Sequence, residues 1–95
     1  MHKCMRAGLK RLSLNKIPAI SDASLLALRT HCAESLEEID ISWCRGMTDH
    51  GVGALVDACD NLARLALWGC TQFTPLFYEG HSNDTLRIIG RPVGI

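Results

Sequence analysis

The sequence has no excess of charge, no closely spaced cysteine pair and no long apolar run. Its 10 basic residues balance its 10 acidic ones, so the chain has no overall field to collect nucleic acid or anionic lipid. None of its 5 cysteines belongs to a C-x-x-C motif, which excludes the usual zinc and redox signatures. No apolar run approaches the roughly 20 residues that a membrane-spanning helix needs. These absences, with 47% hydrophobic residues, leave a small globular domain.

The cysteines and the N-terminal residues bear on the compartment. An odd number of cysteines and the lack of a signal peptide argue against a secreted, disulfide-bonded domain. We therefore expect an intracellular protein, nuclear or cytoplasmic. The stretch before Asp22 is basic and holds no acidic residue, which alternatively suggests a mitochondrial targeting segment.

Self-similarity is the strongest signal in the sequence. Residues 9–14, 36–41 and 62–67 each read L-x-x-L-x-L with aliphatic substitutions, and their starts lie 27 and 26 residues apart. This period falls within the range of roughly 20–29 residues that leucine-rich repeats show. The chain divides into the tail of a preceding repeat (1–8), three repeats (9–35, 36–61 and a degenerate 62–85) and a C-terminal strand and tail (86–95).

Each unit has the pattern of a short strand followed by a helix. The alternation in L-x-L buries one face of the strand, and Ser21 and Thr48 are suitable N-caps for the helical patterns that follow. Stacked units bury their apolar faces against each other. The sequence therefore predicts an α/β leucine-rich-repeat solenoid, a partial right-handed horseshoe with parallel strands inside and helices outside. Its expected core comprises Leu12, Leu14, Ile39, Ile41, Cys44, Leu65, Leu67 and Cys70.

The second repeat resembles the cysteine-containing class of leucine-rich repeats. Its matching residues are Leu36, Ile39, Ile41, Cys44, Met47, Thr48, Asp49, Gly51, Val52, Leu55 and Cys59. This class occurs in F-box receptors of ubiquitin ligases, in a yeast antagonist of mitotic exit and in the repeat protein of global-genome nucleotide excision repair. Three short stretches near the C-terminus, residues 67–73, 80–83 and 88–90, look most like the C-terminus of the repair protein. The resemblance implies a protein-interaction module, the substrate-recognition part of a ubiquitin-ligase or nucleotide-excision-repair complex.

Exposed strand positions are the candidate binding residues, because they line the concave face of such a solenoid. The expected partner contacts are Trp68, Arg64, Glu38, Asp40, Arg11, Ser42 and Trp43. The two tryptophans follow successive strands, and two interpretations stay open for them. They are either interface anchors or side chains packed onto the loop after the strand.

Other functions find little support in the sequence. There is no nucleophile–histidine–acid order, no phosphate-binding loop and no cysteine–histidine cluster at ligand spacing, so we expect no enzyme activity, cofactor or metal. Direct nucleic-acid binding is not expected, nor is a membrane partner. The alternatives to partner recognition are a structural or assembly factor of a mitochondrial complex, or a truncated repeat fragment without independent function.

Overall fold

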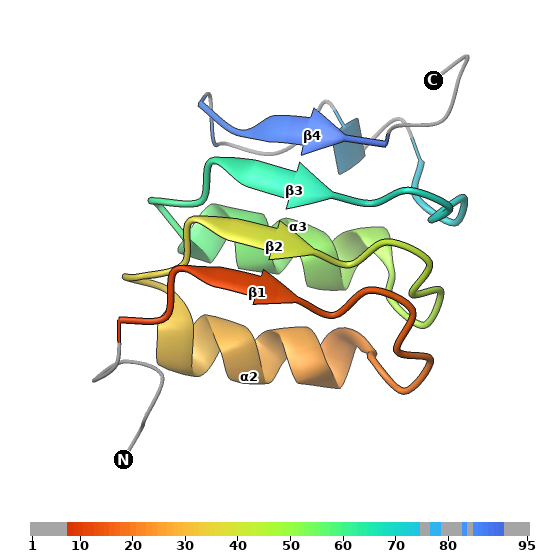
Figure 1. Ribbon diagram of the computed structural model, residues 1–95, viewed down its shortest axis with the longest axis horizontal. Coiled ribbons are helices and arrows are strands. Elements are labelled where there is room, and N and C mark those ends of the chain that lie inside the picture. Colours follow the sequence, from red (N-terminus) through yellow and green to blue (C-terminus); the bar gives the residue numbers. More distant parts are fainter. Residues whose placement is uncertain (1–7, 75–76, 79–82, 84, 91–95) are drawn as a thin grey trace.

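A single parallel sheet organises the chain. The computed structural model describes residues 8–74, 77–78, 83 and 85–90. In this part of the chain the elements are β1 (Arg11–Ser13), α2 (Asp22–Cys32), β2 (Glu38–Asp40), α3 (Asp49–Ala58), β3 (Arg64–Ala66) and β4 (Arg87–Ile89). The strands pair in parallel in the order β1-β2-β3-β4, which is also their order in the sequence (Figure 1).

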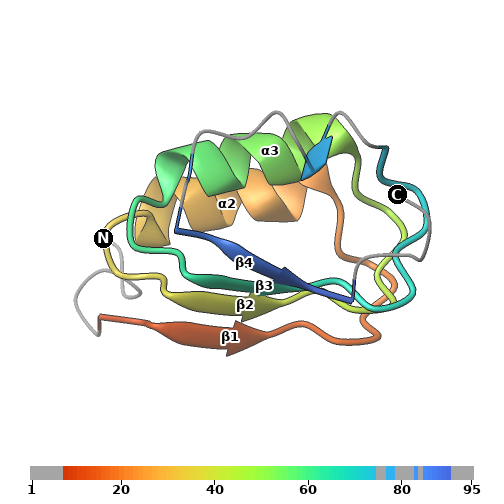
Figure 2. The ribbon, with the colours of Figure 1, turned by 90° about the horizontal axis from the view of Figure 1, so that it is seen from above.

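The helices cover one face of the sheet and leave the other face open. Figure 2 shows α2 and α3 side by side above the strands, and the two helices contact each other. Each helix returns the chain to the start of the next strand, as parallel pairing requires. This arrangement confirms the α/β class and the repeating strand–helix unit that the sequence predicts. Among the described residues, no helix has the length and apolar character needed to cross a membrane.

The core lies between the sheet and the helices. Of the predicted core residues, Ile39, Ile41, Cys44, Leu65, Leu67 and Cys70 are buried. Leu12 and Leu14 pack against this cluster but are only partly buried. The reason is their place in the sheet, because β1 is at its edge and, among the described strands, pairs with β2 alone. On the helix beside it, Leu26 is 52% exposed.

The residues that begin each helix also tie neighbouring repeats together. As predicted, Thr48 caps α3, its hydroxyl accepting a hydrogen bond from the Gly51 N–H. The Asp22 carboxylate accepts hydrogen bonds from the Thr48 N–H (2.9 Å) and the Thr48 hydroxyl (2.7 Å). In the next repeat, the Asp49 carboxylate accepts the N–H and the hydroxyl of Thr74 in the same way. The aspartate at the start of one helix therefore binds the threonine at the equivalent place in the next repeat and links the two repeats.

The repeated cysteines form a second link of this kind. The Cys44 thiol donates to the carbonyl of Leu14 (2.9 Å), and the Cys70 thiol donates to the carbonyls of Ile41 and Cys44 (3.2 and 3.3 Å). Burial raises the pKa of Cys70 against the opposing effect of its backbone hydrogen bonds, which keeps the thiol protonated as a donor. A small buried donor at this position satisfies carbonyls of the preceding repeat.

Candidate partner-binding face

The face of the sheet opposite the helices, here called the open face, carries side chains in transverse rows. Strand register places Arg11, Glu38, Arg64 and Arg87 side by side in one row. The next row comprises Ser13, Asp40, Ala66 and Ile89. The repeat predicts the first three members of each row. The last members come from β4, and sequence reasoning did not single out Arg87.

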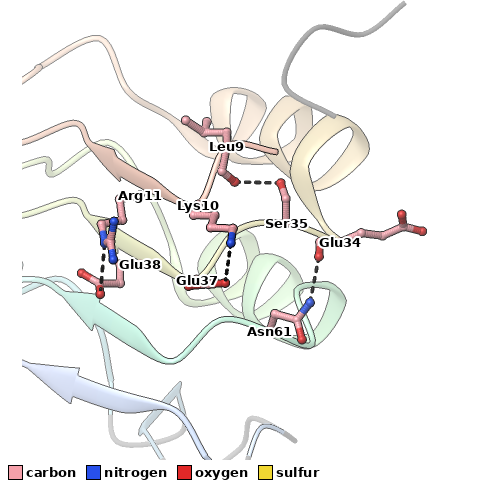
Figure 3. A network of polar contacts seen from close by, with 8 residues as sticks. All are labelled: Leu9, Lys10, Arg11, Glu34, Ser35, Glu37, Glu38 and Asn61. Carbon is pink, nitrogen blue, oxygen red and sulfur yellow. Dashed lines mark hydrogen bonds and ion pairs between the residues drawn. The ribbon is translucent and has the colours of Figure 1, made fainter. Parts of the chain in front are cut away.

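Charges pair on the β1–β2 side of the open face. Arg11 Nε lies 3.6 Å from Glu38 Oε2, and Lys10 Nζ lies 3.9 Å from Glu37 Oε2 (Figure 3). These groups are largely exposed to solvent, so each pair contributes about 0–1 kcal/mol. These ion pairs neutralise the charge of Arg11 in β1 and of Lys10 just before it.

The loops that lead into β2 and β3 are held by hydrogen bonds to the repeat before them. The Ser35 hydroxyl donates to the carbonyl of Leu9 (2.7 Å), and the Asn61 amide donates to the carbonyl of Glu34 (2.8 Å) (Figure 3). Each bond joins residues one repeat apart in the sequence. The strands of the open face therefore begin at fixed positions relative to one another.

Arg64 and Arg87 form the opposite end of the charged row. Both are exposed, and neither forms an ion pair with any residue that the structure describes. Directly opposed like charges on neighbouring strands, about 4.8 Å apart, are unfavourable. Within the described residues, the β3–β4 side of the open face therefore holds two arginines without an ion pair, and Glu38 of β2 borders this side at Arg64.

Asp40 is a fixed anion at the centre of the open face. Burial acts to raise the pKa of Asp40, but hydrogen bonds from the Ser42 side chain and backbone and from Asn15 outweigh it and lower the pKa below its usual 3.8. The Ser42 N–H donates to Asp40 Oδ1 at 2.9 Å. The carboxylate therefore stays ionised and oriented at physiological pH.

Ser42 is buried, although the sequence predicts an exposed position there. Its side chain is 1% exposed and lies against the backbone of Trp68, just beyond the ends of β2 and β3. The Ser42 hydroxyl accepts a hydrogen bond from the Trp68 N–H (3.0 Å), and the same side chain hydrogen-bonds Asp40. Ser42 therefore holds two predicted contact residues in place and is closed to a partner.

The two tryptophans lie just beyond β2 and β3. Each ring is partly packed and partly exposed, so neither interpretation from the sequence, interface anchor or packed side chain, describes it alone. Trp43 and Trp68 are 50% and 55% exposed. A Cβ built on Gly69 would lie 2.1 Å from Trp43 Cε3, and one built on Gly90 would lie 2.8 Å from Trp68 Cδ2. Each indole therefore rests against the glycine of the following repeat with one part and faces solvent with the rest.

Trp43 has an unusual backbone conformation at the turn after its strand. Lys16, Trp43 and Gly69 occupy equivalent positions in the strand register, and all three have positive φ. Glycine adopts this conformation without strain, whereas a tryptophan at φ 65° costs about 1–2 kcal/mol. Lys16 has the same conformation at the equivalent position, so this strain belongs to the turn of the repeat.

The open face carries the features of a recognition surface. Aromatic and arginine side chains are held on a rigid sheet, and such residues dominate protein interfaces. His31 and His50 lie on or beside the helices, away from the strands of the open face. Within the described residues, no group of three His, Cys, Asp or Glu side chains is placed to hold a metal.

Comparison with known proteins supports the fold. The chain is similar to a chain in the crystal structure of the yeast Rad7 and Elc1 complex, with a TM-score of 0.73 and 24% sequence identity. The alignment covers 87% of this chain but 19% of that chain, so the present sequence spans about a fifth of its neighbour's length. No family model matches the sequence. At this level of identity the likeness establishes a shared repeat-like α/β architecture.

Proposed function

We propose that the chain is a segment of a leucine-rich-repeat solenoid that recognises a protein partner through its open face. The observation that carries the proposal is the presence of both Arg64 and Trp68 on the open face. Both are exposed on β3 and the turn after it, and the Ser42 hydroxyl fixes the backbone of Trp68. A tryptophan whose backbone is already held in place loses less conformational freedom when a partner binds.

The structural neighbour supports a protein partner. That neighbour is a complex of two proteins, and its fold matches most of the present chain. Together with the resemblance of short stretches within residues 67–90 to the repair repeat protein, it supports a role in a ubiquitin-ligase or nucleotide-excision-repair complex.

The proposal extends to chemistry and compartment. We propose that the chain has no catalytic activity of its own, and that it acts in the nucleus or cytoplasm. Fluorescence imaging of a C-terminally tagged chain, with N-terminal sequencing of the purified product, tests the compartment. A mitochondrial chain that has lost its basic N-terminal residues would favour the assembly-factor alternative.

Affinity capture from the cells that make the protein tests the central proposal. The tagged chain is compared with an Arg64→Ala, Trp68→Ala variant, and captured proteins are identified by mass spectrometry. An Arg29→Ala variant is the matched control, because Arg29 is an exposed arginine on α2. Ligase or repair subunits that disappear with the first variant and remain with the control would support it. Subunits that bind all three folded forms equally would contradict it.

A further inference from the structure

The open face divides into two halves of different character. Over β1 and β2, Arg11 is paired with Glu38, and the anionic Asp40 lies in the next row. Over β3 and β4, Arg64 and Arg87 are neighbours in the strand register, and neither forms an ion pair with a described residue. The molecule as a whole is neutral, so this positive charge is a local feature.

Apolar surface continues from the arginines along the same strands. Ala66 and Ile89 form the next row and are half-buried, and Trp68 lies beyond them against Gly90. We define these residues as the β3–β4 patch: Arg64, Ala66, Trp68, Arg87 and Ile89. Residues two apart in a strand lie about 6.6 Å from each other. The patch therefore presents cations at one end, a shallow apolar floor in the middle and an aromatic wall at the other end.

We propose that the β3–β4 patch binds an extended segment of the partner protein in which acidic residues precede an apolar residue. This inference rests on the proposed function and names the chemistry of the partner. Carboxylates placed between Arg64 and Arg87 relieve the repulsion between the guanidinium groups and form charge-assisted hydrogen bonds. An apolar side chain of the same segment, two to four residues away from the acidic ones, covers Ala66 and Ile89 and contacts Trp68.

Charge distribution favours a protein segment over nucleic acid. A phosphate backbone requires cations along its whole track. A nucleic-acid strand that ran across the sheet from Arg64 towards β2 would meet the carboxylates of Glu38 and Asp40. The Asp40 carboxylate is ionised and would repel the phosphates. Two adjacent arginines bounded by carboxylates suit a short acidic sequence. The same carboxylates repel an acidic segment from β2 and set its position on the sheet.

Peptide binding to the 95-residue chain tests this inference. The probe is a fluorescent peptide library in which a glutamate pair precedes a leucine at varied spacing, with a glutamine library as reference, read by anisotropy. We expect an Arg64→Gln, Arg87→Gln variant to bind the best glutamate peptide at least about tenfold more weakly than the unaltered chain. An Arg29→Gln control should bind normally, and an Arg64→Lys, Arg87→Lys variant should regain part of the affinity. Circular dichroism checks that each variant is folded.

Salt and competition separate the outcomes. Binding of the glutamate peptide should weaken as ionic strength rises, because exposed charges are screened within about 10 Å at 0.1 M salt. Equal binding of both libraries, or no binding of either, would overturn the acidic segment. If capture of partner subunits still depended on Arg64 and Trp68, the proposed function would stand without it. Tighter binding of an oligothymidylate through the same arginines would overturn the proposal in favour of nucleic acid.

Discussion

Replacing Gly69 with alanine should destabilise the fold by two separable effects. Gly69 has a φ of 74°, and alanine in this left-handed region costs about 1–2 kcal/mol. The new Cβ would also lie 2.1 Å from Trp43 Cε3, far inside ordinary contact, so the indole must move. Overpacking of this kind typically costs about 1–3 kcal/mol. The sum is a large part of the about 5–15 kcal/mol that stabilises a domain.

A double-mutant cycle isolates the steric part. In a Trp43→Ala background the Cβ introduced at position 69 meets no indole, so we expect the Gly69→Ala substitution to cost only the backbone strain. Urea unfolding followed by far-ultraviolet circular dichroism gives the four free energies, which avoids a probe that depends on Trp43. The coupling should be about 1–3 kcal/mol. An equal cost in both backgrounds would show that the ring does not rest on Gly69, and no cost in either would refute the left-handed conformation as well.

Three further predictions concern polar and thiol groups. Ser42→Ala should reduce the free energy of unfolding by about 1–3 kcal/mol, because the Trp68 N–H loses its acceptor and Asp40 loses one of its hydrogen bonds. Ser42→Thr should restore part of this free energy, and an unchanged urea midpoint in Ser42→Ala would contradict the prediction. Since the pKa of Asp40 is lowered, its contribution is present above the usual 3.8 and is lost as pH falls through the lowered value. The free energy of unfolding of an Asp40→Asn variant should therefore fall less between neutral and acid pH than that of the unaltered chain. An equal fall in both proteins would contradict this prediction. In a Cys4→Ser variant, the remaining cysteines are buried and should react with a thiol reagent only when the chain unfolds. Burial, followed by the charge of Asp60, raises the pKa of Cys59 to about 11, so this thiol stays protonated and unreactive. Fast labelling of the native chain would contradict this prediction.

The elements of the fold follow directly from the repeat. Leu12, Ile39 and Leu65 occupy equivalent places, so a parallel register of β1 to β3 could be read from the sequence alone. The helix starts at Ser21 and Thr48 carry local signals that do not depend on tertiary structure. Repetition makes such inference reliable, because each unit confirms the pattern of the others.

Contacts between repeats were less accessible to sequence reasoning. Ser42 has the alternation of an exposed residue, yet its hydroxyl is buried between Asp40 and the backbone of Trp68. The sequence suggests that Asp49 stabilises the positive end of its helix, but not that its carboxylate holds Thr74 of the following repeat. Such roles depend on how side chains extend across the stack, which a one-dimensional pattern does not contain.

Arg87 illustrates the same limit at the open face. The last strand begins 23 residues after Arg64, a shorter interval than the earlier ones, so its register was not evident. One signal was present in the sequence. An arginine precedes the inward residue in both strands, Leu65 in one and Ile88 in the other.

Site-specific photocrosslinking tests the central claim most directly. A photoreactive amino acid is placed at Ala66, on the open face between Arg64 and Trp68, or at Ala27, an exposed position on α2. The account predicts that the Ala66 probe crosslinks in cells to the protein captured through Arg64 and Trp68, and that the Ala27 probe does not. Crosslinks to that protein from Ala27 alone would place recognition on the helical face and contradict the account.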